Sequence, residues 1–423
     1  MAGTIDTSAQ TRVQRHYENS PWAPLREPLF RSLWVAALIS YTGTWMRNVG
    51  AGWLMTQLTT SPLMISLVQA ASTLPVFLVI LPAGALADMV DRRRLLLITQ
   101  AWMAAAAALL GMFTLLEHIT PWTLLLFTFV LGLGAVMNDP AWQAITPEVV
   151  SPERHAPAVA LNSVGYNVAR AVGPAIGGLV IAAAGAGVDF LINAVSFFGV
   201  IFFLYRWKRP HFQGVDAARV RDAMIDGLRY VRDARVVQCV LIRTAAFSIG
   251  ASSLLALLPI VARPHGATGY GFLLGYFGLG ALAGAAVLPR LRSRLSVDGV
   301  VAFAIVVFAL MTFAAGQVQS FGWLSLVLFV SGTAWIGILA CLNVAAQTMS
   351  PSYLRARALS AYILVLQGGM AVGSALWGAV ASRFSVPTAL LCSAAALMVG
   401  LLAVRRYRLT RHELEFAPAV IRD

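Results

Sequence analysis

The sequence predicts an all-α membrane protein of about twelve transmembrane helices, arranged as two six-helix halves with both termini in the cytoplasm. Hydrophobic residues make up 59% of the chain and charged residues 12%, and the mean hydropathy is +0.75. This is more apolar surface than a soluble domain can bury. Apolar runs long enough to cross a hydrocarbon core of roughly 30 Å recur along the chain. Basic residues gather in alternate gaps between these runs.

The apolar runs define the expected spans. Short gaps rich in Gly, Pro, Ser or charged residues separate most of them. Many runs carry Gly, Ala and Ser at close spacing, which lets helix backbones approach one another in lipid. The runs begin near Phe30, Pro62, Leu95, Pro121, Pro157 and Val188 in the first half, and near Val236, Tyr270, Val297, Phe321, Ala358 and Pro387 in the second.

The distribution of arginine predicts the orientation. The N-terminal tail, the second, fourth, sixth, eighth and tenth gaps and the C-terminus are basic, whereas the alternate gaps hold few charges, among them Asp189 and Arg263. Because cytoplasmic loops are enriched in Lys and Arg, both termini are expected in the cytoplasm. Topology therefore explains the net charge of +13, and no nucleic-acid partner is expected because no stacking aromatic residues interleave the basic ones.

The long sixth gap divides the chain into two halves. We expect a cytoplasmic tail over residues 1–29, six-helix halves over 30–205 and 236–404, a cytoplasmic linker with an amphipathic helix over 206–235, and a cytoplasmic tail over 405–423. An offset of about 200 residues aligns Gly84 with Gly284 and Arg92 with Arg292, which indicates a duplicated unit. Parallel repeats of this kind commonly enclose a substrate path, so the pattern favours a transporter.

The loop between the second and third spans carries the most specific motif. From Gly84 to Leu96 the sequence is Gly-Ala-Leu-Ala-Asp-Met-Val-Asp-Arg-Arg-Arg-Leu-Leu. It resembles the hallmark loop of the major facilitator superfamily, and the resemblance implies the major facilitator fold. It also implies a conformational gate in which Gly84 permits close helix approach, Asp88 holds a charge network that locks one face, and Arg92 and Arg93 supply cytoplasmic charge. A plain basic turn would explain the arginines but not Asp88 at the end of an apolar helix.

This loop departs from the family pattern at two positions, because Met89 replaces the usual arginine and Asp91 the usual glycine. The resemblance nevertheless extends over nearly the whole chain through the span number, the repeat and the central loop. Within the superfamily, the segments Asn138–Ala141 and Pro147–Val150 are similar to the branch of enterobactin-type siderophore exporters and related drug-efflux proteins.

A second motif lies in the fifth span. The run of Gly173, Pro174, Gly177 and Gly178 resembles the latter half of the family's antiporter motif, which is associated with exporters. The upstream glycines of that motif are replaced by Asn162 and Ala169. Tight glycine packing without any meaning for the direction of transport is the alternative interpretation.

Few charges fall inside the expected spans. They are Arg47, Arg170, Arg243 and one carboxylate, Asp139, which we add to the predicted gate. Charges in the hydrocarbon region are costly, so they are candidates for function. The excess of positive charge suggests an anionic solute, with the Arg170 guanidinium as central donor. The alternatives are that Arg170 pairs with Asp139 or a backbone carbonyl, and that Arg243 reaches the inner interface.

Several polar residues interrupt the apolar runs and complete a hypothetical substrate path. Each of them could instead form hydrogen bonds between helices. The predicted path comprises Arg47, Asn48, Tyr166, Asn167, Arg170, Asn193, Arg243 and Gln367, and the predicted gate comprises Gly84, Asp88, Arg92, Arg93 and Asp139.

These observations predict a secondary active transporter in the inner (plasma) membrane of a bacterium. We expect it to act as a monomer and to export small anionic, siderophore-like or drug-like molecules by alternating access. Proton coupling would use a carboxylate, for which Asp88 and Asp139 are the candidates. A lipid flippase and an importer of the same fold are the alternatives.

An enzyme is not expected. The sequence has neither an HExxH motif nor a suggestive intramembrane Ser, His and Asp set, and it has no P-loop that would indicate direct use of ATP. Its three cysteines lie in apolar stretches without metal-binding spacing, so no metal and no cofactor are expected.

Overall fold

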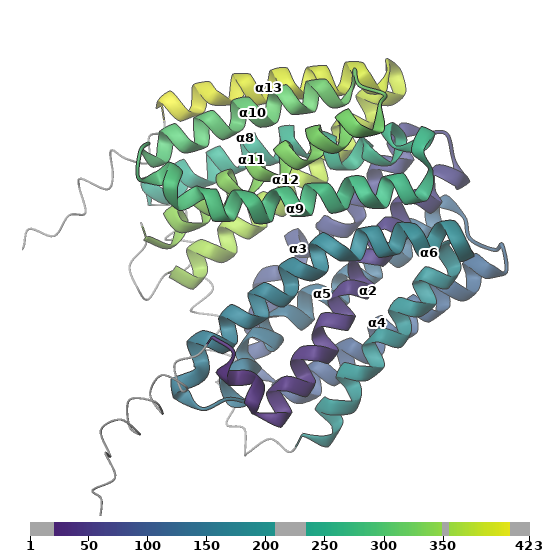
Figure 1. Cartoon of the computed structure of the whole chain (residues 1–423), viewed down its shortest axis with the longest axis vertical. Coiled ribbons are helices and arrows are strands. Elements are labelled where there is room, and N and C mark those ends of the chain that lie inside the picture. Colours follow the sequence, from purple (N-terminus) through teal and green to yellow (C-terminus); the bar gives the residue numbers. More distant parts are fainter. Residues whose placement is uncertain (1–20, 208–233, 349–354, 407–423) are drawn as a thin grey trace, which may run out of the picture.

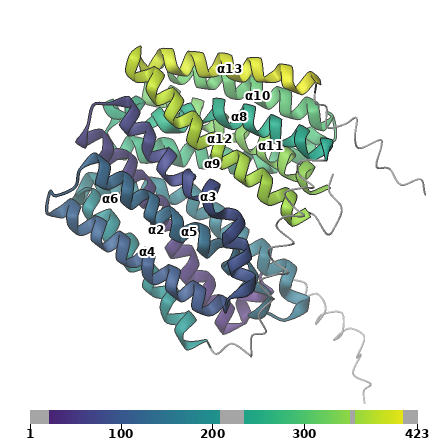
Figure 2. The same cartoon turned by 180° about the vertical axis from the view of Figure 1, so that it is seen from behind.

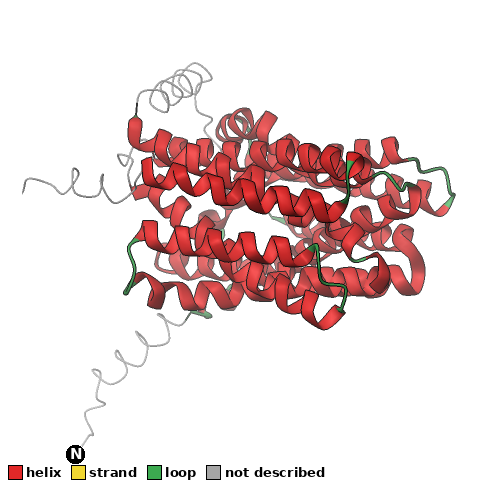
Figure 3. Cartoon of the chain, turned by 90° about the horizontal axis from the view of Figure 1, so that it is seen from above, coloured by secondary structure: helices red, strands yellow, loops and turns green. Residues whose placement is uncertain are grey.

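The computed structural model describes residues 21–207, 234–348 and 355–406. Most of the expected N-terminal tail, linker and C-terminal tail lies outside these ranges, including the predicted amphipathic helix of the linker. Within them every element is helical (Figure 3). Nine of the described helical segments are long and apolar enough to cross a membrane, which agrees with the predicted all-α membrane class.

The helices form two bundles, which lie side by side in Figures 1 and 2. The N-terminal bundle contains α2 (Pro28–Leu58), α3 (Pro62–Met89), α4 (Arg92–Leu115), α5 (Pro121–Ile145) and α6 (His155–Arg206). The C-terminal bundle contains α8 (Arg235–Val261), α9 (Gly266–Arg292), α10 (Val297–Ala315), α11 (Phe321–Thr348), α12 (Arg355–Arg383) and α13 (Val386–Arg406). Short 3-10 helices are η1 (Ala23–Arg26), η2 (Thr146–Glu148), η3 (Pro152–Arg154) and η4 (Arg263–His265).

The long α6 is two helices that join at Gly185. The φ angle of this residue is +82°, in the left-handed region that glycine adopts without a steric penalty. The helix resumes at once, so the predicted fifth and sixth spans are the two arms of α6 with hardly any loop between them.

Short polar side chains begin several helices by accepting hydrogen bonds from free backbone amides. Ser61 accepts from Met64 at the start of α3, and Thr120 and Thr123 form a capping box at the start of α5. Asp91 caps α4 by accepting from the backbone nitrogens of Arg93 (2.8 Å) and Arg94 (3.2 Å). The aspartate that departs from the family pattern therefore starts a helix.

The two bundles touch at one end and diverge at the other, so that they form a V in Figures 1 and 2. At the closed end α6 meets α9 so tightly that a Cβ on Gly178 would lie 2.7 Å from the carbonyl oxygen of Ala267. At the same end the backbone nitrogen of Leu63, in α3, donates to Oγ of Ser382, in α12 (2.9 Å). Glycine is needed at such contacts because any larger residue would separate the backbones.

Candidate functional site

A central cavity of about 430 Å³ lies between the two bundles. Helices α2, α3 and α6 line it from the N-terminal bundle, and α8, α9, α11 and α12 from the C-terminal bundle. Four residues of the predicted path contribute to its wall: Asn48, Tyr166, Arg170 and Gln367. Most of the remaining wall is apolar or aromatic, and such a wall with a few polar groups is typical of a small-molecule site.

Arg170 is the charged residue in the wall of this cavity, and it lies between aromatic rings of both bundles. Its guanidinium carbon is 5.8 Å from the ring centroid of Trp45, in α2, and 5.9 Å from that of Phe277, in α9. These distances are within the range of cation–π attraction. Among the described residues Arg170 forms no ion pair with Asp139, so that alternative is not realised in this structure. The sequence did not indicate the two aromatic partners.

Further aromatic side chains shape the same cavity. Tyr270 stacks on Trp53 with ring centroids 6.4 Å apart and planes inclined by 27°. Trp335 packs against Phe277 at a centroid distance of 5.9 Å. Tyr270 comes from α9 and Trp335 from α11, so the C-terminal bundle supplies flat apolar surfaces opposite the polar groups of α2 and α6.

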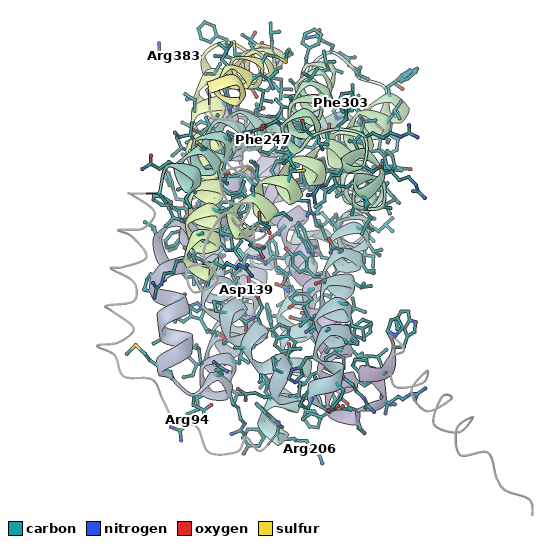
Figure 4. All side chains as sticks on the ribbon, turned by 90° about the vertical axis from the view of Figure 1, so that its left-hand side faces the viewer. Arg94, Asp139, Arg206, Phe247, Phe303 and Arg383 are labelled. Atoms are coloured by element: carbon teal, nitrogen blue, oxygen red, sulfur yellow. The ribbon has the colours of Figure 1, made fainter. Side chains whose placement is uncertain are left out.

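A second cavity of about 460 Å³ lies within the N-terminal bundle, between α2, α5 and α6. Its wall includes Asp139 and Asn167, and Figure 4 shows Asp139 in the middle of the molecule. Tyr166 lines both cavities. Its ring contacts Tyr41 and Trp45 edge to face at centroid distances of 5.4 and 6.1 Å, so aromatic packing holds the residue that both cavities share.

Arg47 and Asn193 face the interface of α2 with the second arm of α6 and line neither cavity. Both are buried, and Nη2 of Arg47 donates to Oδ1 of Asn48 (3.0 Å). The same interface buries Asp189 completely, which we had expected in an outer gap. That expectation was wrong because the turn at Gly185 is so short that Asp189 already belongs to the helix. The spacing of Asp189, Asn193 and Ser196 along one helix face was the available signal.

Arg243 lies inside the C-terminal bundle, where its guanidinium forms an ion pair with Asp298 of α10. The arginine side chain is 2% exposed and the aspartate side chain 14%. Arg243 therefore does not line the central cavity, and its carboxylate partner is half-buried in the first turn of α10. We did not anticipate Asp298 from the sequence, although a carboxylate in the first turn of an apolar helix was a visible signal.

The family described as "Transmembrane secretion effector" matches residues 19–420. The chain belongs to this family. Its curated relatives are transporters of the major facilitator superfamily, as the hallmark loop indicated, and they are not enzymes.

This transporter is 26% identical over 416 residues to the multidrug efflux pump Tap of Mycolicibacterium fortuitum, which covers 93% of the chain and 99% of that protein. It is 26% identical over 409 residues to the enterobactin exporter EntS of Escherichia coli, covering 90% of the chain and 94% of EntS. The match to the staphyloferrin A transporter of Staphylococcus aureus, at 27% identity, covers 38% of the chain and only 41% of that protein.

Solved structures show the same fold at low identity. The POT-family transporter PepTSo superposes with a TM-score of 0.74 at 13% identity, covering 92% of this chain and 99% of that one. A bacterial homologue of the lysosomal transporter Spinster gives a TM-score of 0.73 at 14% identity, covering 94% and 99%.

In this transporter the arginines of the hallmark loop join neighbouring helix ends of the N-terminal bundle to one another. Nη1 of Arg92 forms an ion pair with Oε1 of Glu148 (3.0 Å), in η2. Arg93 donates to the carbonyl oxygens of Leu204 (2.8 Å) and Tyr205 (2.6 Å), in the last turn of α6, where free carbonyl groups favour a cation. The other two predicted gate residues of the loop, Gly84 and Asp88, belong to α3, but their side chains lie outside the described part of the structure.

The glycines of the antiporter-like motif serve both faces of α6. A Cβ on Gly173 would lie 2.7 Å from Cβ of Trp45, and a Cβ on Gly177 would lie 2.8 Å from Cα of Met46, so these two glycines admit α2. Gly178 instead faces α9 of the other bundle, and Pro174 lines the central cavity. The motif thus packs three helices around the cavity wall.

Proposed function

We propose that this protein is a secondary active transporter of about twelve spans that exports small aromatic anions of the siderophore or drug type from a bacterial cytoplasm. The observation that carries the proposal is the position of Arg170 in the central cavity, between the rings of Trp45 and Phe277. Export and the broad substrate class are supported by the relatives, which include a multidrug efflux pump and an enterobactin exporter.

The chemistry of the cavity favours a planar anion. A guanidinium presents its donors along the edge of a plane and binds an oxyanion with two parallel hydrogen bonds. The rings of Trp45 and Phe277 beside it offer aromatic surface to the rest of a flat solute. Because Arg170 has no carboxylate partner among the described residues, an anionic ligand would supply the missing charge.

The arrangement of the bundles supports alternating access. The cavity lies between two bundles that touch at one end and diverge at the other, so a rocking motion about the cavity would exchange the open end. We assign both termini to the cytoplasm from the arginine pattern, which makes the diverging end the cytoplasmic one. We further propose location in the inner membrane, exchange for protons and function as a monomer.

The test uses an anion that cannot cross lipid by itself. Inside-out membrane vesicles containing the protein are given 1-naphthalenesulfonate, its neutral counterpart 1-naphthalenesulfonamide, and the cation tetraphenylphosphonium, each with and without an inward-acidic pH gradient. We expect gradient-dependent accumulation of the sulfonate alone. Arg170→Ala should lower it by about tenfold or more, because charge-assisted hydrogen bonds contribute about 1.5–3 kcal/mol. Arg94→Ala, which removes an exposed arginine from the start of α4, is the matched control and should transport normally.

Other outcomes separate the alternatives. Equal accumulation of the sulfonamide, or an unchanged rate in Arg170→Ala, would contradict anion recognition by Arg170. Gradient-driven uptake only into right-side-out vesicles would identify an importer. A phospholipid that copurifies at fixed stoichiometry and is moved in place of the sulfonate would favour a flippase.

A further inference from the structure

A buried polar layer lies between α2 and the second arm of α6, separate from both cavities. On α2 its residues are Gly43, Arg47 and Gly50, which share one helix face. On α6 they are Asp189, Asn193 and Ser196, again at helical spacing. The two faces are in close contact, since a Cβ on Gly50 would lie 2.6 Å from Oδ2 of Asp189 and a Cβ on Gly43 would lie 2.8 Å from Oγ of Ser196.

The charged groups of this layer are incompletely satisfied. Both carboxylate oxygens of Asp189 are buried and accept no hydrogen bond from any described residue, and Nε of Arg47 likewise has no acceptor. The two side chains are close enough to interact electrostatically, but they do not form an ion pair within 4.0 Å. An isolated carboxylate anion without hydrogen bonds is very costly in such a place, whereas the neutral acid is tolerated. The geometry therefore fits a protonated Asp189.

No other ionisable group of the described helices faces Asp189. From α2 the ionisable neighbour is Arg47. From α4 the residues that pack against Gly187, near Asp189, are Gly111 and Leu115, and neither can ionise. The titratable residues of the connection after α4, Glu117 and His118, are exposed.

We propose that Asp189 is the proton-binding site of this transporter and that Arg47 links it to the central cavity. In the described state Nη2 of Arg47 donates to Oδ1 of Asn48, and Asn48 lines that cavity. When the carboxyl group of Asp189 releases its proton to water, the resulting carboxylate attracts the guanidinium of Arg47, which stays protonated throughout. Arg47 then leaves Oδ1 of Asn48, so the amide is free to rotate in the cavity wall and to turn its Nδ2 donor towards an anionic solute.

In this linkage proton binding and solute binding disfavour each other, as an antiporter requires. A solute that binds Asn48 favours the ionised form of Asp189, and by reciprocity proton binding to Asp189 lowers the affinity for the solute. The inference rests on the proposed function for its transport role, but the protonation of Asp189 can be measured without any transport.

The first experiment is an infrared difference spectrum of the purified full-length protein in lipid, titrated from acidic to alkaline pH. We expect the carbonyl stretch of a buried protonated carboxyl group near neutral pH in the wild type, its loss in Asp189→Asn, and its return in Asp189→Glu. Asp139→Asn, which alters the carboxylate of the second cavity, should retain the band. If Asp189→Asn leaves the band unchanged, the site is not where we place it.

The second experiment separates coupling from transport in proteoliposomes. For Asp189→Asn we expect loss of the pH-driven accumulation of 1-naphthalenesulfonate, with equilibrium exchange of the same anion retained, because the amide resembles the neutral acid. Full gradient-driven accumulation by Asp189→Asn, or loss of coupling in Asp139→Asn alone, would overturn the inference. If the wild type moves no naphthalenesulfonate at all, the proposed function fails while the infrared result still decides the site.

Discussion

Nη2 of Arg263, in η4 of the C-terminal bundle, lies 2.9 Å from the carbonyl oxygen of Thr56, in the last turn of α2. The same nitrogen donates to the carbonyl oxygen of Thr59 (3.0 Å). The last carbonyl groups of a helix lack partners within it and carry partial negative charge, so an arginine is favourable there. Because donor and acceptors belong to different bundles, this contact holds the closed end together.

We expect Arg263→Ala to open that end more often. Charge-assisted hydrogen bonds of this kind contribute about 1.5–3 kcal/mol, enough to shift a two-state equilibrium by about tenfold or more. Spin labels can be placed at Glu117 and Ser320, which are exposed on connections of different bundles, in a variant that lacks the three native cysteines. Double electron–electron resonance between the two labels should then report longer distances for Arg263→Ala than for the unaltered arginine. Arg383→Ala removes an exposed arginine at the same end and should leave the distance distribution unchanged. Identical distributions for Arg263→Ala and the wild type would contradict the role of Arg263.

Gly178→Ala should weaken the contact between α6 and α9. Its new Cβ would lie 2.7 Å from the carbonyl oxygen of Ala267 and 3.0 Å from Cα of Gly271, and backbone atoms cannot give way as a flexible side chain can. We expect longer distances between the same labels and a lower Tm, since overpacking costs about 1–3 kcal/mol. Gly322→Ala is the control, because nothing lies within 4 Å of its added Cβ. A Gly178→Ala protein as stable and as closed as the control would be evidence against a tight contact.

Asp298→Asn should strongly destabilise the C-terminal bundle. Removing the carboxylate partner of an arginine that is 2% exposed weakens the compensation of a buried cation and costs up to about 3–5 kcal/mol, whereas replacing both members with apolar residues is often tolerated. We therefore expect a large drop in Tm for Asp298→Asn and recovery in the double variant Arg243→Met, Asp298→Leu. Thermal unfolding followed by tryptophan fluorescence would measure both.

The double variant also tests whether Arg243 belongs to the substrate path. Since Arg243 does not line the central cavity, naphthalenesulfonate transport per folded molecule should be close to that of the wild type. A stable double variant that no longer transports the anion would place Arg243 back in the path.

Tyr166→Ala should join the two cavities. The ring of Tyr166 lines both and is packed against Tyr41 and Trp45, so its removal leaves open space between them. We expect faster efflux of 1-naphthalenesulfonate from preloaded proteoliposomes and poorer accumulation against a gradient. Tyr166→Phe keeps the ring and should behave as the wild type does. Equal efflux from the alanine and phenylalanine variants would show that the ring is not a barrier.

Several features of the helices were predictable residue by residue. The expected starts at Pro62, Pro121, Val297 and Phe321 coincide with the starts of α3, α5, α10 and α11. At α3 and α5 a proline opens the helix and Ser61 or Thr120 caps it, and Ser296 caps α10, so the local sequence is sufficient for these three ends. The start near Tyr270 was late, because α9 begins at Gly266 with apolar and small residues that the hydropathy pattern did not include.

The pairing of charges was not predictable in the same way. Arg170 was recognisable as a costly intramembrane charge, yet its neighbours Trp45 and Phe277 come from helices far away in the chain. Arg243 and Asp298 are 55 residues apart, and nothing in either segment specifies the other. For Asp189 the error was local, since a turn of one glycine moved a residue expected in a gap into a helix interface.

The sequence by itself determined that the chain is an apolar, helical membrane protein, where many helices begin and which family it belongs to. These properties depend on the hydropathy of each segment and on hydrogen bonds between neighbouring residues, which a linear pattern contains. Only the tertiary structure decided that Arg170 faces a cavity, that Arg243 forms an ion pair with Asp298, and that Arg47 lies near Asp189. The rotation of each helix about its axis decides which side chains meet, and packing against the neighbouring helices sets that rotation.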